Sequence, residues 1–376
     1  MKKIFFGRPV ITRACMFVLA VFVVTSCNKN SDHWLDSHKA PYQLNNFAQT
    51  NLVANSGSYN PVTIDPLLIN GWGLAFSPTG VAWPGSQGGH VGPVYNSEGM
   101  IARPAVTIPS PGGNTGGNPS GVVFNGSTDF ALPEPNNQAA RFIFVGLDGI
   151  LSGWNAAAGN SAVLVKNNSS TAVYTGLAIA SIEGSGYLYA SNFKAGTVDV
   201  FDKNFNPVWM PFKDPGIPEG YAPFNIQAIG NWLYVAYAKV GLDGRDVPGK
   251  GNGYVSVFTK NGNFVKRFAS RGQLNAPWGI ARTPSTFFDA GQVEKQGLNA
   301  ILVGNFGDGR INAYTADGSY LGELANDNKP VVIPGLWAIS FVPPTATAID
   351  SNRLYFAAGP RGELDGLFGY LNRQKK

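Results

Sequence analysis

Short runs of alternating apolar and polar residues recur along the chain, and a glycine opens each of them. Three of the clearest runs are residues 196–201, 253–258 and 309–314. Alternation with a period of two, opened by a residue that breaks regular structure, is typical of a β-strand. The six opening glycines are spaced by 57, 47, 57, 56 and 57 residues: Gly92, Gly149, Gly196, Gly253, Gly309 and Gly366. This repeat predicts a β-propeller in which each repeat forms one four-stranded blade.

Each repeat also contains the other strands that a blade needs. Short runs with small residues precede the glycines and predict inner strands along a crowded channel, at residues 72–76, 120–124, 175–179, 224–228, 278–282 and 337–341. Apolar runs such as residues 187–192 and 301–305 predict second strands that are buried on both faces. Turns such as Asn261-Gly262 lead to a fourth strand at residues 264–268. The sequence therefore predicts one all-β domain over residues 41–371, a six-bladed propeller of four-stranded antiparallel blades.

The last repeat lacks room for its own fourth strand. Its third strand is expected to end at Leu371, and residues 372–376 are only a short C-terminal tail. Residues 47–55 resemble the fourth-strand region at residues 321–326. We therefore predict that this N-terminal segment pairs with the C-terminal blade and closes the ring, so that no strand edge stays open there.

Residues 1–26 have the features of a signal peptide. Four positive residues are followed by an apolar run over residues 14–24, which is too short to span a membrane. Residues 24–27, Val-Thr-Ser-Cys, resemble the cleavage signal of bacterial lipoproteins, which implies lipid attachment at Cys27. The alternative is an ordinary signal peptide with an incidental cysteine. Residues 27–40 are polar and aperiodic and predict a flexible tether, so we expect an exported protein anchored to a bacterial membrane, on the periplasmic side or the cell surface.

Removal of this leader changes the charge balance. The chain has 28 Lys and Arg residues against 23 Asp and Glu residues, but four of the positive residues and no acidic residue precede Cys27. The remainder carries a charge of about +1 without a basic stripe, which argues against nucleic-acid binding. Since Cys15 lies in the leader, only Cys27 remains and no internal disulfide is expected. We expect a monomer.

Four longer segments carry a resemblance to a known group of proteins. These are residues 65–75, 195–202, 304–314 and 358–369. They are similar to an uncharacterised family of exported bacterial β-propeller proteins, and the strand that follows Pro277 resembles a blade of NHL-repeat propellers. The resemblance covers nearly the whole mature chain and implies six blades, but it implies no activity. Residues 81–89 depart from the family, whose members tend to have a loop of Asp-Asn-Gly type there.

Aromatic and amide residues gather at one expected face. In a propeller, the entries to the inner strands and the loops after the second strands surround the same mouth of the channel. The candidate ligand-binding residues there are Asn70, Trp72, Asn118, Tyr174, Asn192, Phe224, Asn225, Trp278, Asn305 and Trp337. An open rim of this kind would stack on a sugar or another planar ligand and hydrogen-bond its edges. The alternative is that the aromatic residues plug the channel or pack between blades, while the asparagines cap loops.

Residues for catalysis are few. His90 is the only histidine of the propeller region, which excludes a histidine-rich metal centre or a histidine dyad, and we expect His90 in a surface loop. The enzymatic alternative is a lactonase-type hydrolase that holds calcium at the channel mouth. Its oxygen ligands would come from Asn192, Asn225, Asn305, Asp308, Glu363 and Asp365, and the other interpretation of the three acids is turn chemistry. The acidic run at residues 243–246 is expected to be a solvated excursion.

The sequence thus favours a lipid-anchored binding or scaffold module at the cell envelope. Its ligand would be a glycan, a peptide or a partner protein, and no catalytic residue is assigned. The alternative function is a calcium-dependent lactonase-type or other hydrolase with its site at the mouth of the channel.

Overall fold

The predicted strands form six antiparallel sheets in a computed structural model that describes residues 44–288 and 298–374. The first three blades are β3 (Gly71–Phe76), β4 (Ala82–Ser86), β5 (Val91–Tyr95) and β6 (Ile101–Thr107); β9 (Pro119–Phe124), β10 (Phe142–Gly146), β11 (Ile150–Trp154) and β12 (Val163–Asn167); and β13 (Tyr174–Ile182), β14 (Ser185–Asn192), β15 (Thr197–Phe201) and β16 (Pro207–Val208).

The fourth blade consists of β17 (Tyr221–Ile229), β18 (Trp232–Lys239), β19 (Tyr254–Thr259) and β20 (Phe264–Ser270), and the fifth of β21 (Pro277–Arg282), β22 (Ile301–Asn305), β23 (Ile311–Tyr314) and β24 (Tyr320–Glu323). The sixth blade consists of β27 (Leu336–Ser340), β28 (Leu354–Ala358), β29 (Leu367–Arg373) and β1 (Phe47–Ala54), with β2 (Thr63–Ile64) parallel to β1 at the outer edge. Two short hairpins lie outside the blades: β7 (Pro109–Ser110) with β8 (Gly113–Gly116), and β25 (Ala325–Asn326) with β26 (Lys329–Pro330).

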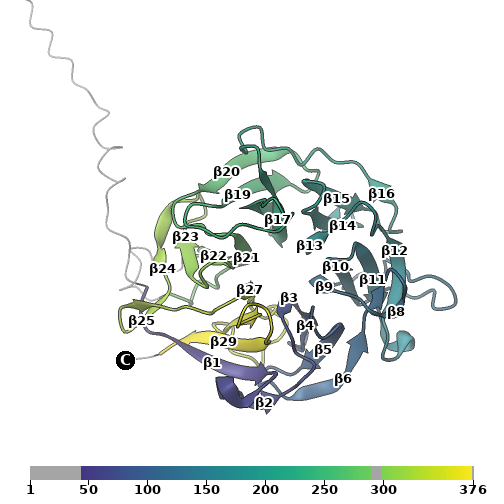
Figure 1. The fold of residues 1–376 in the computed structure, drawn as a ribbon, viewed down its shortest axis with the longest axis horizontal. Helices are drawn as coiled ribbons and strands as arrows, with labels where there is room; N and C mark the ends of the chain where they lie inside the picture. The colour runs from purple at the N-terminus through teal and green to yellow at the C-terminus, as the bar shows by residue number, and fades with distance from the viewer. Residues whose placement is uncertain (1–43, 289–297, 375–376) are drawn as a thin grey trace, which may run out of the picture. The chain divides into compact units, whose positions relative to one another are not determined.

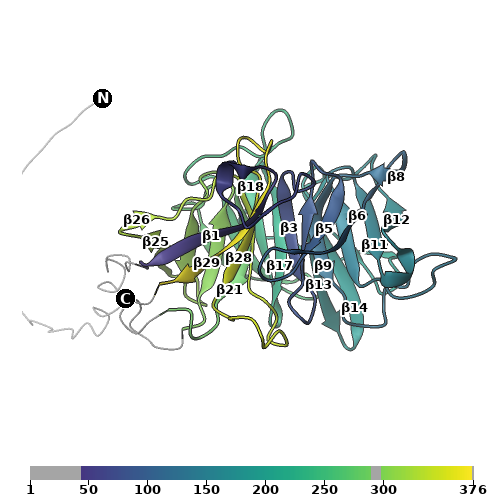
Figure 2. The same ribbon diagram turned by 90° about the horizontal axis from the view of Figure 1, so that it is seen from below.

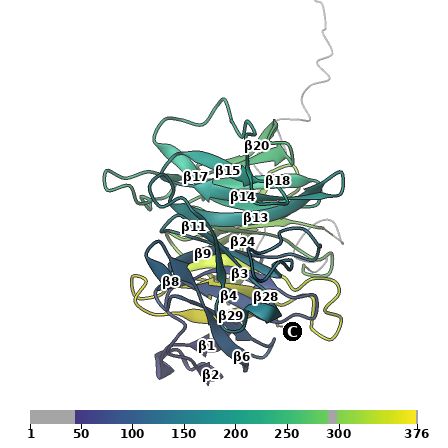
Figure 3. The same cartoon turned by 90° about the vertical axis from the view of Figure 1, so that its right-hand side faces the viewer.

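The six sheets are arranged in a ring, which confirms the predicted six-bladed propeller. In Figure 1 the first strand of each blade, β3, β9, β13, β17, β21 and β27, lies nearest the centre, and the fourth strands lie at the rim. Figure 3 shows the sheets from the side, where neighbouring blades follow one another in layers. Each predicted glycine stands in or just before the third strand of its blade.

The ring closes through the N-terminal strand, as predicted. β1 pairs antiparallel with β29, from Phe47 opposite Arg373 to Ala54 opposite Leu367, and the two strands lie side by side in Figure 2. The Phe47 side chain is fully buried and stacks on Phe287, with a centroid distance of 5.0 Å. The sixth blade therefore obtains its fourth strand from a segment that is about 300 residues away in the sequence.

Neighbouring inner strands approach closely at the second position of each predicted run. A Cβ atom at Gly73 would lie 2.7 Å from the Ser120 carbonyl oxygen, and one at Gly279 would lie 2.7 Å from the Trp337 carbonyl oxygen. Such contacts leave no room for a side chain at these two glycines. The equivalent residues of the six blades are Gly73, Gly121, Gly176, Asn225, Gly279 and Ala338, so the fourth blade alone has a polar side chain at this level of the channel.

Candidate functional site

The aromatic residues predicted at the channel mouth pack on one another. Trp72 stacks on Trp337 with a centroid distance of 3.5 Å, and Phe306 stacks on the same indole at 3.8 Å. Trp278 meets both tryptophans edge-on, and Phe224 meets Trp337 in the same way. The three indoles and the Phe224 ring are each at most 4% exposed. The described side chains therefore form an aromatic plug (Trp72, Phe224, Trp278, Phe306 and Trp337), which is the arrangement of the second alternative from the sequence.

Hydrogen bonds hold two of the three indoles in place. Trp337 Nε1 donates to Asn70 Oδ1 at 2.9 Å, and Trp278 Nε1 donates to the Thr175 carbonyl oxygen at 2.9 Å. Trp72 Nε1 is buried and has no hydrogen-bond partner among the described residues. Because burial of an unpaired N–H group costs free energy, the packing of the Trp72 ring must offset that cost.

A polar chain lies next to the plug and joins loops of different blades. Asn70 Nδ2 donates to Glu363 Oε2 at 2.9 Å and to Gln87 Oε1 at 3.0 Å. Gln87 Nε2 in turn donates to Asn118 Oδ1 at 3.0 Å, and Arg245 forms an ion pair with Glu363 at 2.9 Å. Asn70 thus bonds to Trp337 of the plug, and Asn118 is linked to Asn70 through Gln87.

The acidic run at residues 243–246 is only partly the solvated excursion that the sequence suggested. Asp243 and Arg245 are exposed, but Arg245 reaches Glu363 of the sixth blade. Asp246 Oδ2 is buried and has no hydrogen-bond partner among the described residues. Burial, followed by the nearby charge of Glu363, raises the pKa of Asp246 to about 6. The expectation was wrong for Asp246 because an isolated β-bridge between Val240 and Asp246 folds the loop back on itself.

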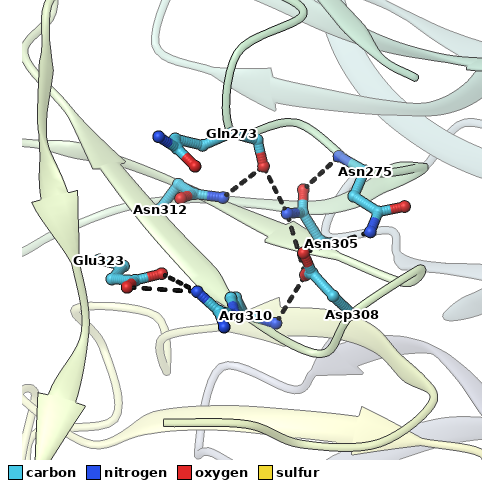
Figure 4. Close-up of polar contacts among 7 residues, drawn as sticks. All are labelled: Gln273, Asn275, Asn305, Asp308, Arg310, Asn312 and Glu323. Carbon is cyan, nitrogen blue, oxygen red and sulfur yellow. Dashed lines mark hydrogen bonds and ion pairs between the residues drawn. The ribbon is translucent and has the colours of Figure 1, made fainter. Parts of the chain in front are cut away.

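Asn305 is held inside the fifth blade, as Figure 4 shows. Its Nδ2 donates to the Gln273 carbonyl oxygen at 2.8 Å and to Asp308 Oδ1 at 3.1 Å, while its Oδ1 accepts from the Asn275 backbone N–H at 3.1 Å. Asp308 Oδ2 accepts from Asn275 Nδ2 at 3.2 Å. The amide therefore ties the end of β22 to the loop that precedes β21.

Asn192 makes the equivalent contacts at the end of β14 in the third blade. Its Nδ2 donates to Asp199 Oδ2 at 2.9 Å, and its Oδ1 accepts from the Val173 backbone N–H at 3.3 Å. The Tyr174 hydroxyl donates to the same carboxylate oxygen at 3.0 Å. The structure thus places Tyr174, Asn192 and Asn305 in networks within single blades and not in the plug.

The acids of the hydrolase alternative accept hydrogen bonds from protein groups. Asp365 Oδ1 accepts from Asn55 Nδ2 at 3.0 Å and its Oδ2 accepts from the Tyr59 hydroxyl at 2.7 Å, while Asp308 and Glu363 are bonded as described above. Among residues 44–288 and 298–374 there is no group of three or more His, Cys, Asp and Glu residues that could hold a metal ion. His90 is exposed in its loop, as expected, and its Nδ1 lies 2.9 Å from the Gly117 carbonyl oxygen.

A cavity of about 300 Å³ occupies the channel beside the plug. Its wall is made by the inner strands of all six blades and includes Trp278. The lining contains no charged side chain, and its polar side chains are Asn225, Gln227 and Ser340. Towards the other ends of the inner strands, Gln227, Ser340 and Phe341 are partly exposed. The channel is therefore a pocket next to the aromatic plug, in which most lining side chains are apolar but polar groups make up about half of the lining surface.

Sequence reasoning did not find this pocket, although it named two of its residues, Asn225 and Trp278. A comparison of the six inner strands would have indicated it. Asn225 and Gln227 are two residues apart on one strand, so they share a face, and the other five strands have Gly or Ala at the position of Asn225. Ser340 occupies the position of Gln227 in the sixth blade. The site was instead predicted at the entries of the inner strands, whereas Gln227 and Ser340 lie toward their other ends.

The predicted signal peptide, the tether and Cys27 lie outside the described residues. No helix in the part of the chain that the structure describes is both long enough and apolar enough to cross a membrane. Lipid attachment, export and the predicted domain limits stay predictions.

Comparisons with solved structures give only remote similarities. A streptogramin B lyase has 12% identity and a TM-score of 0.49, with 87% of this chain and 97% of that chain covered. A virginiamycin B lyase from Staphylococcus aureus with Quinupristin has 13% identity and a TM-score of 0.47, with 87% and 99% covered. A gluconolactonase from Xanthomonas campestris has 13% identity and a TM-score of 0.34, with 62% and 82% covered. At these identities and scores, none of these similarities bears on activity.

No family model matches the chain. Relatives occur among the proteins of Acanthamoeba polyphaga mimivirus. Uncharacterized protein L690 is 41% identical over 53% of this chain and 51% of its own length. Uncharacterized protein R648 is 32% identical over 335 residues, which cover 85% of this chain and 79% of R648. These relatives are viral, so they give no support to a bacterial origin or to export. The identity and coverage with R648 show that this chain belongs to the same family as uncharacterized protein R648.

Proposed function

We propose that the protein is a binding module whose channel pocket holds a small, uncharged ligand with both apolar and hydrogen-bonding surface. The observation that supports this proposal is the cavity of about 300 Å³, which lies next to the aromatic plug. Small-molecule sites are usually concave and combine apolar side chains with a few polar groups, and this volume is at the lower end of their range. The ligand would be a compact molecule, such as a planar ring with one hydrogen-bonding edge.

The polar groups of the pocket indicate the chemistry of that edge. Asn225 Nδ2 already donates to the Trp278 carbonyl oxygen at 2.8 Å. No hydrogen bond is found for the Gln227 side chain within residues 44–288 and 298–374. The Gln227 amide can therefore donate to and accept from a ligand, which fits an amide or a similar group. The absence of charged side chains from the lining favours a neutral ligand, because a buried unpaired charge is costly.

A fragment screen by protein-observed NMR, which follows the indole N–H resonances, would test this proposal. The probes are neutral aromatic amides and aliphatic amides of similar size, added to the full-length protein. Binding is expected to shift the indole N–H resonance of Trp278, because this residue lines the pocket. The Ser340→Phe variant, which fills the pocket, is expected to lose this binding.

Ser181→Phe is the matched control. Ser181 also lies near the end of an inner strand, but it is exposed and does not line the pocket. Fragments that bind the wild type and Ser181→Phe, but not Ser340→Phe, would support the proposal. Equal binding to both variants would place the fragments elsewhere, and no binding by any neutral amide would contradict the proposal.

We also propose membrane attachment through Cys27, supported by the sequence pattern of residues 1–27 alone. The Cys27→Ala variant is expected to move from the membrane fraction to the soluble fraction of expressing bacteria, with Cys15→Ala as the control. Retention of Cys27→Ala in the membrane fraction would overturn this assignment. The result is independent of the channel pocket, since it concerns a different part of the chain.

A further inference from the structure

The third blade has an unusually short outer strand. β16 contains two residues, Pro207–Val208, whereas the fourth strands of the other blades contain four to eight. β16 pairs only with Val200 and Phe201 of β15, and beyond Val208 the described chain no longer pairs with β15. The first part of β15, from Thr197 to Asp199, therefore lacks an outer partner strand within the described residues.

A groove of about 750 Å³ lies where the outer strand is missing. Two continuous segments line it, residues 196–201 and residues 207–213, together with Asn168 and Thr171. Successive side chains of a strand point to opposite faces, so an unbroken run of lining residues means that the backbone edge of β15 faces the groove. One side of the groove is thus the outer edge of β15.

The pairing register shows which backbone groups face outward. The Asp202 N–H donates to the Asn206 carbonyl oxygen in the turn, and Val200 stands opposite Val208. Outward-facing groups alternate along an antiparallel strand, so the N–H and C=O groups of Val198 face the groove. No hydrogen bond of these two groups is found on that side among the described residues.

The other side of the groove provides apolar surface and a positive charge. Trp209 is 85% exposed and is followed by Met210 and Pro211, which also line the groove. Lys213 at the end of this segment is exposed, and no ion pair or hydrogen bond of its side chain is found in residues 44–288 and 298–374. Asp199, the acid of the groove, already accepts hydrogen bonds from Tyr174 and Asn192.

We propose that this groove binds an extended peptide segment of a partner protein. The peptide adds to the edge of β15 as an outer strand, its backbone pairs with Val198, an apolar side chain packs against Trp209, and a carboxylate pairs with Lys213. Addition of a strand to an open sheet edge is a common mode of peptide recognition, with affinity from the main chain and specificity from alternate side chains. This inference does not depend on the channel pocket, because the two sites share no lining residue.

Titration with a designed peptide would test the proposal. The probe is an eight-residue peptide of alternating Val and Thr with one Glu near its end, and the readouts are tryptophan fluorescence and amide hydrogen exchange of the full-length protein. Binding is expected to shift the emission of Trp209 and to slow exchange at Val198. The same peptide with N-methylated backbone amides is expected to bind about tenfold more weakly or not at all, because it cannot donate the main-chain hydrogen bonds.

Protein variants separate the groove from other exposed surfaces. Trp209→Ala is expected to weaken binding about tenfold, whereas Trp232→Ala should leave it unchanged, because Trp232 is a second exposed tryptophan in a blade with a complete outer strand. Lys213→Glu should weaken binding of the Glu peptide and strengthen binding of a Lys peptide. Equal binding of the N-methylated peptide would overturn the proposal. The proposal would also be overturned if the protein bound a cello-oligosaccharide through Trp209 but bound no peptide. Dimerisation of the protein through Trp209 would overturn it as well.

Discussion

At the scale of single residues, the inner strands show how one position combines packing with function. Five of the six blades have Gly or Ala where the strands approach most closely, and the fourth has Asn225. Its Nδ2 bonds the Trp278 carbonyl oxygen of the next blade, and its Oδ1 lies where a Cβ atom of Gly176 would be. The amide therefore fits only because the neighbouring blade has glycine, and it brings a polar group to the end of the pocket.

This packing predicts the effect of a methyl group at Gly73. The added Cβ atom would lie 2.7 Å from the Ser120 carbonyl oxygen and 2.9 Å from the Val122 nitrogen, so two inner strands must separate. We expect Gly73→Ala to lower the free energy of unfolding by about 1–3 kcal/mol, as overpacking usually does. Denaturant unfolding measures this change. Ala338→Gly at the equivalent position is the control, with a smaller loss, and equal losses would contradict the account.

Asp246 predicts a dependence of stability on pH. Its pKa is raised to about 6 in the folded protein, so the folded protein binds this proton more tightly than the unfolded chain does. Ionisation therefore costs stability as the pH rises from about 4 to about 6, and the cost persists at higher pH. We expect Asp246→Asn to be more stable than the wild type at about pH 8 and equally stable below about pH 4. Thermal melts across this pH range measure the difference, and Asp243→Asn, at an exposed residue, is the control. The account would be contradicted if the two variants had the same pH dependence of stability.

At the scale of elements, the N-terminal strand is the connection that closes the ring. β1 pairs with β29 over most of its length, and Phe47 packs among buried residues of the fifth and sixth blades. Deletion of residues 44–55 would expose the edge of β29 and this apolar surface to water. We expect the melting temperature to fall by about 10 °C or more, whereas deletion of residues 1–40 should leave it nearly unchanged. Similar melting temperatures for the two truncations would mean that β1 does not hold the ring closed.

The sequence predicted the blades better than the site because the two depend on different kinds of contact. Glycines at constant spacing and alternating runs are local patterns, and they located the inner and third strands and the pairing of β1. The short outer strand β16 was not predicted, since Pro207 and Val208 have no pattern that shows where pairing ends. Whether Trp72, Trp278 and Trp337 form an open rim or a plug depends on contacts between residues 59 to 265 positions apart, which no local pattern contains.

At the scale of the whole molecule, the arrangement of acids predicts how the protein responds to calcium. Asp308, Glu363 and Asp365 each accept hydrogen bonds from protein groups, so an ion would have to displace these partners. We expect millimolar calcium to leave the melting temperature unchanged and to induce no lactone hydrolysis. A saturable rise in melting temperature would reveal a specific ion site, since a ligand that binds the folded state stabilises it. If calcium also induced lactone hydrolysis, the two results together would favour a calcium-dependent hydrolase.

The central claim is that the described part of the ring encloses an accessible channel pocket next to the aromatic plug, lined by Asn225, Gln227 and Trp278 among others. A crystal structure of the protein soaked with the tightest-binding neutral amide would test this claim most directly. We predict density for the amide in the channel, with its polar edge at Gln227 and the plug unchanged. Density on the other side of an opened plug, beside Asn70 and Glu363, would contradict the account and restore the open aromatic rim as the binding site.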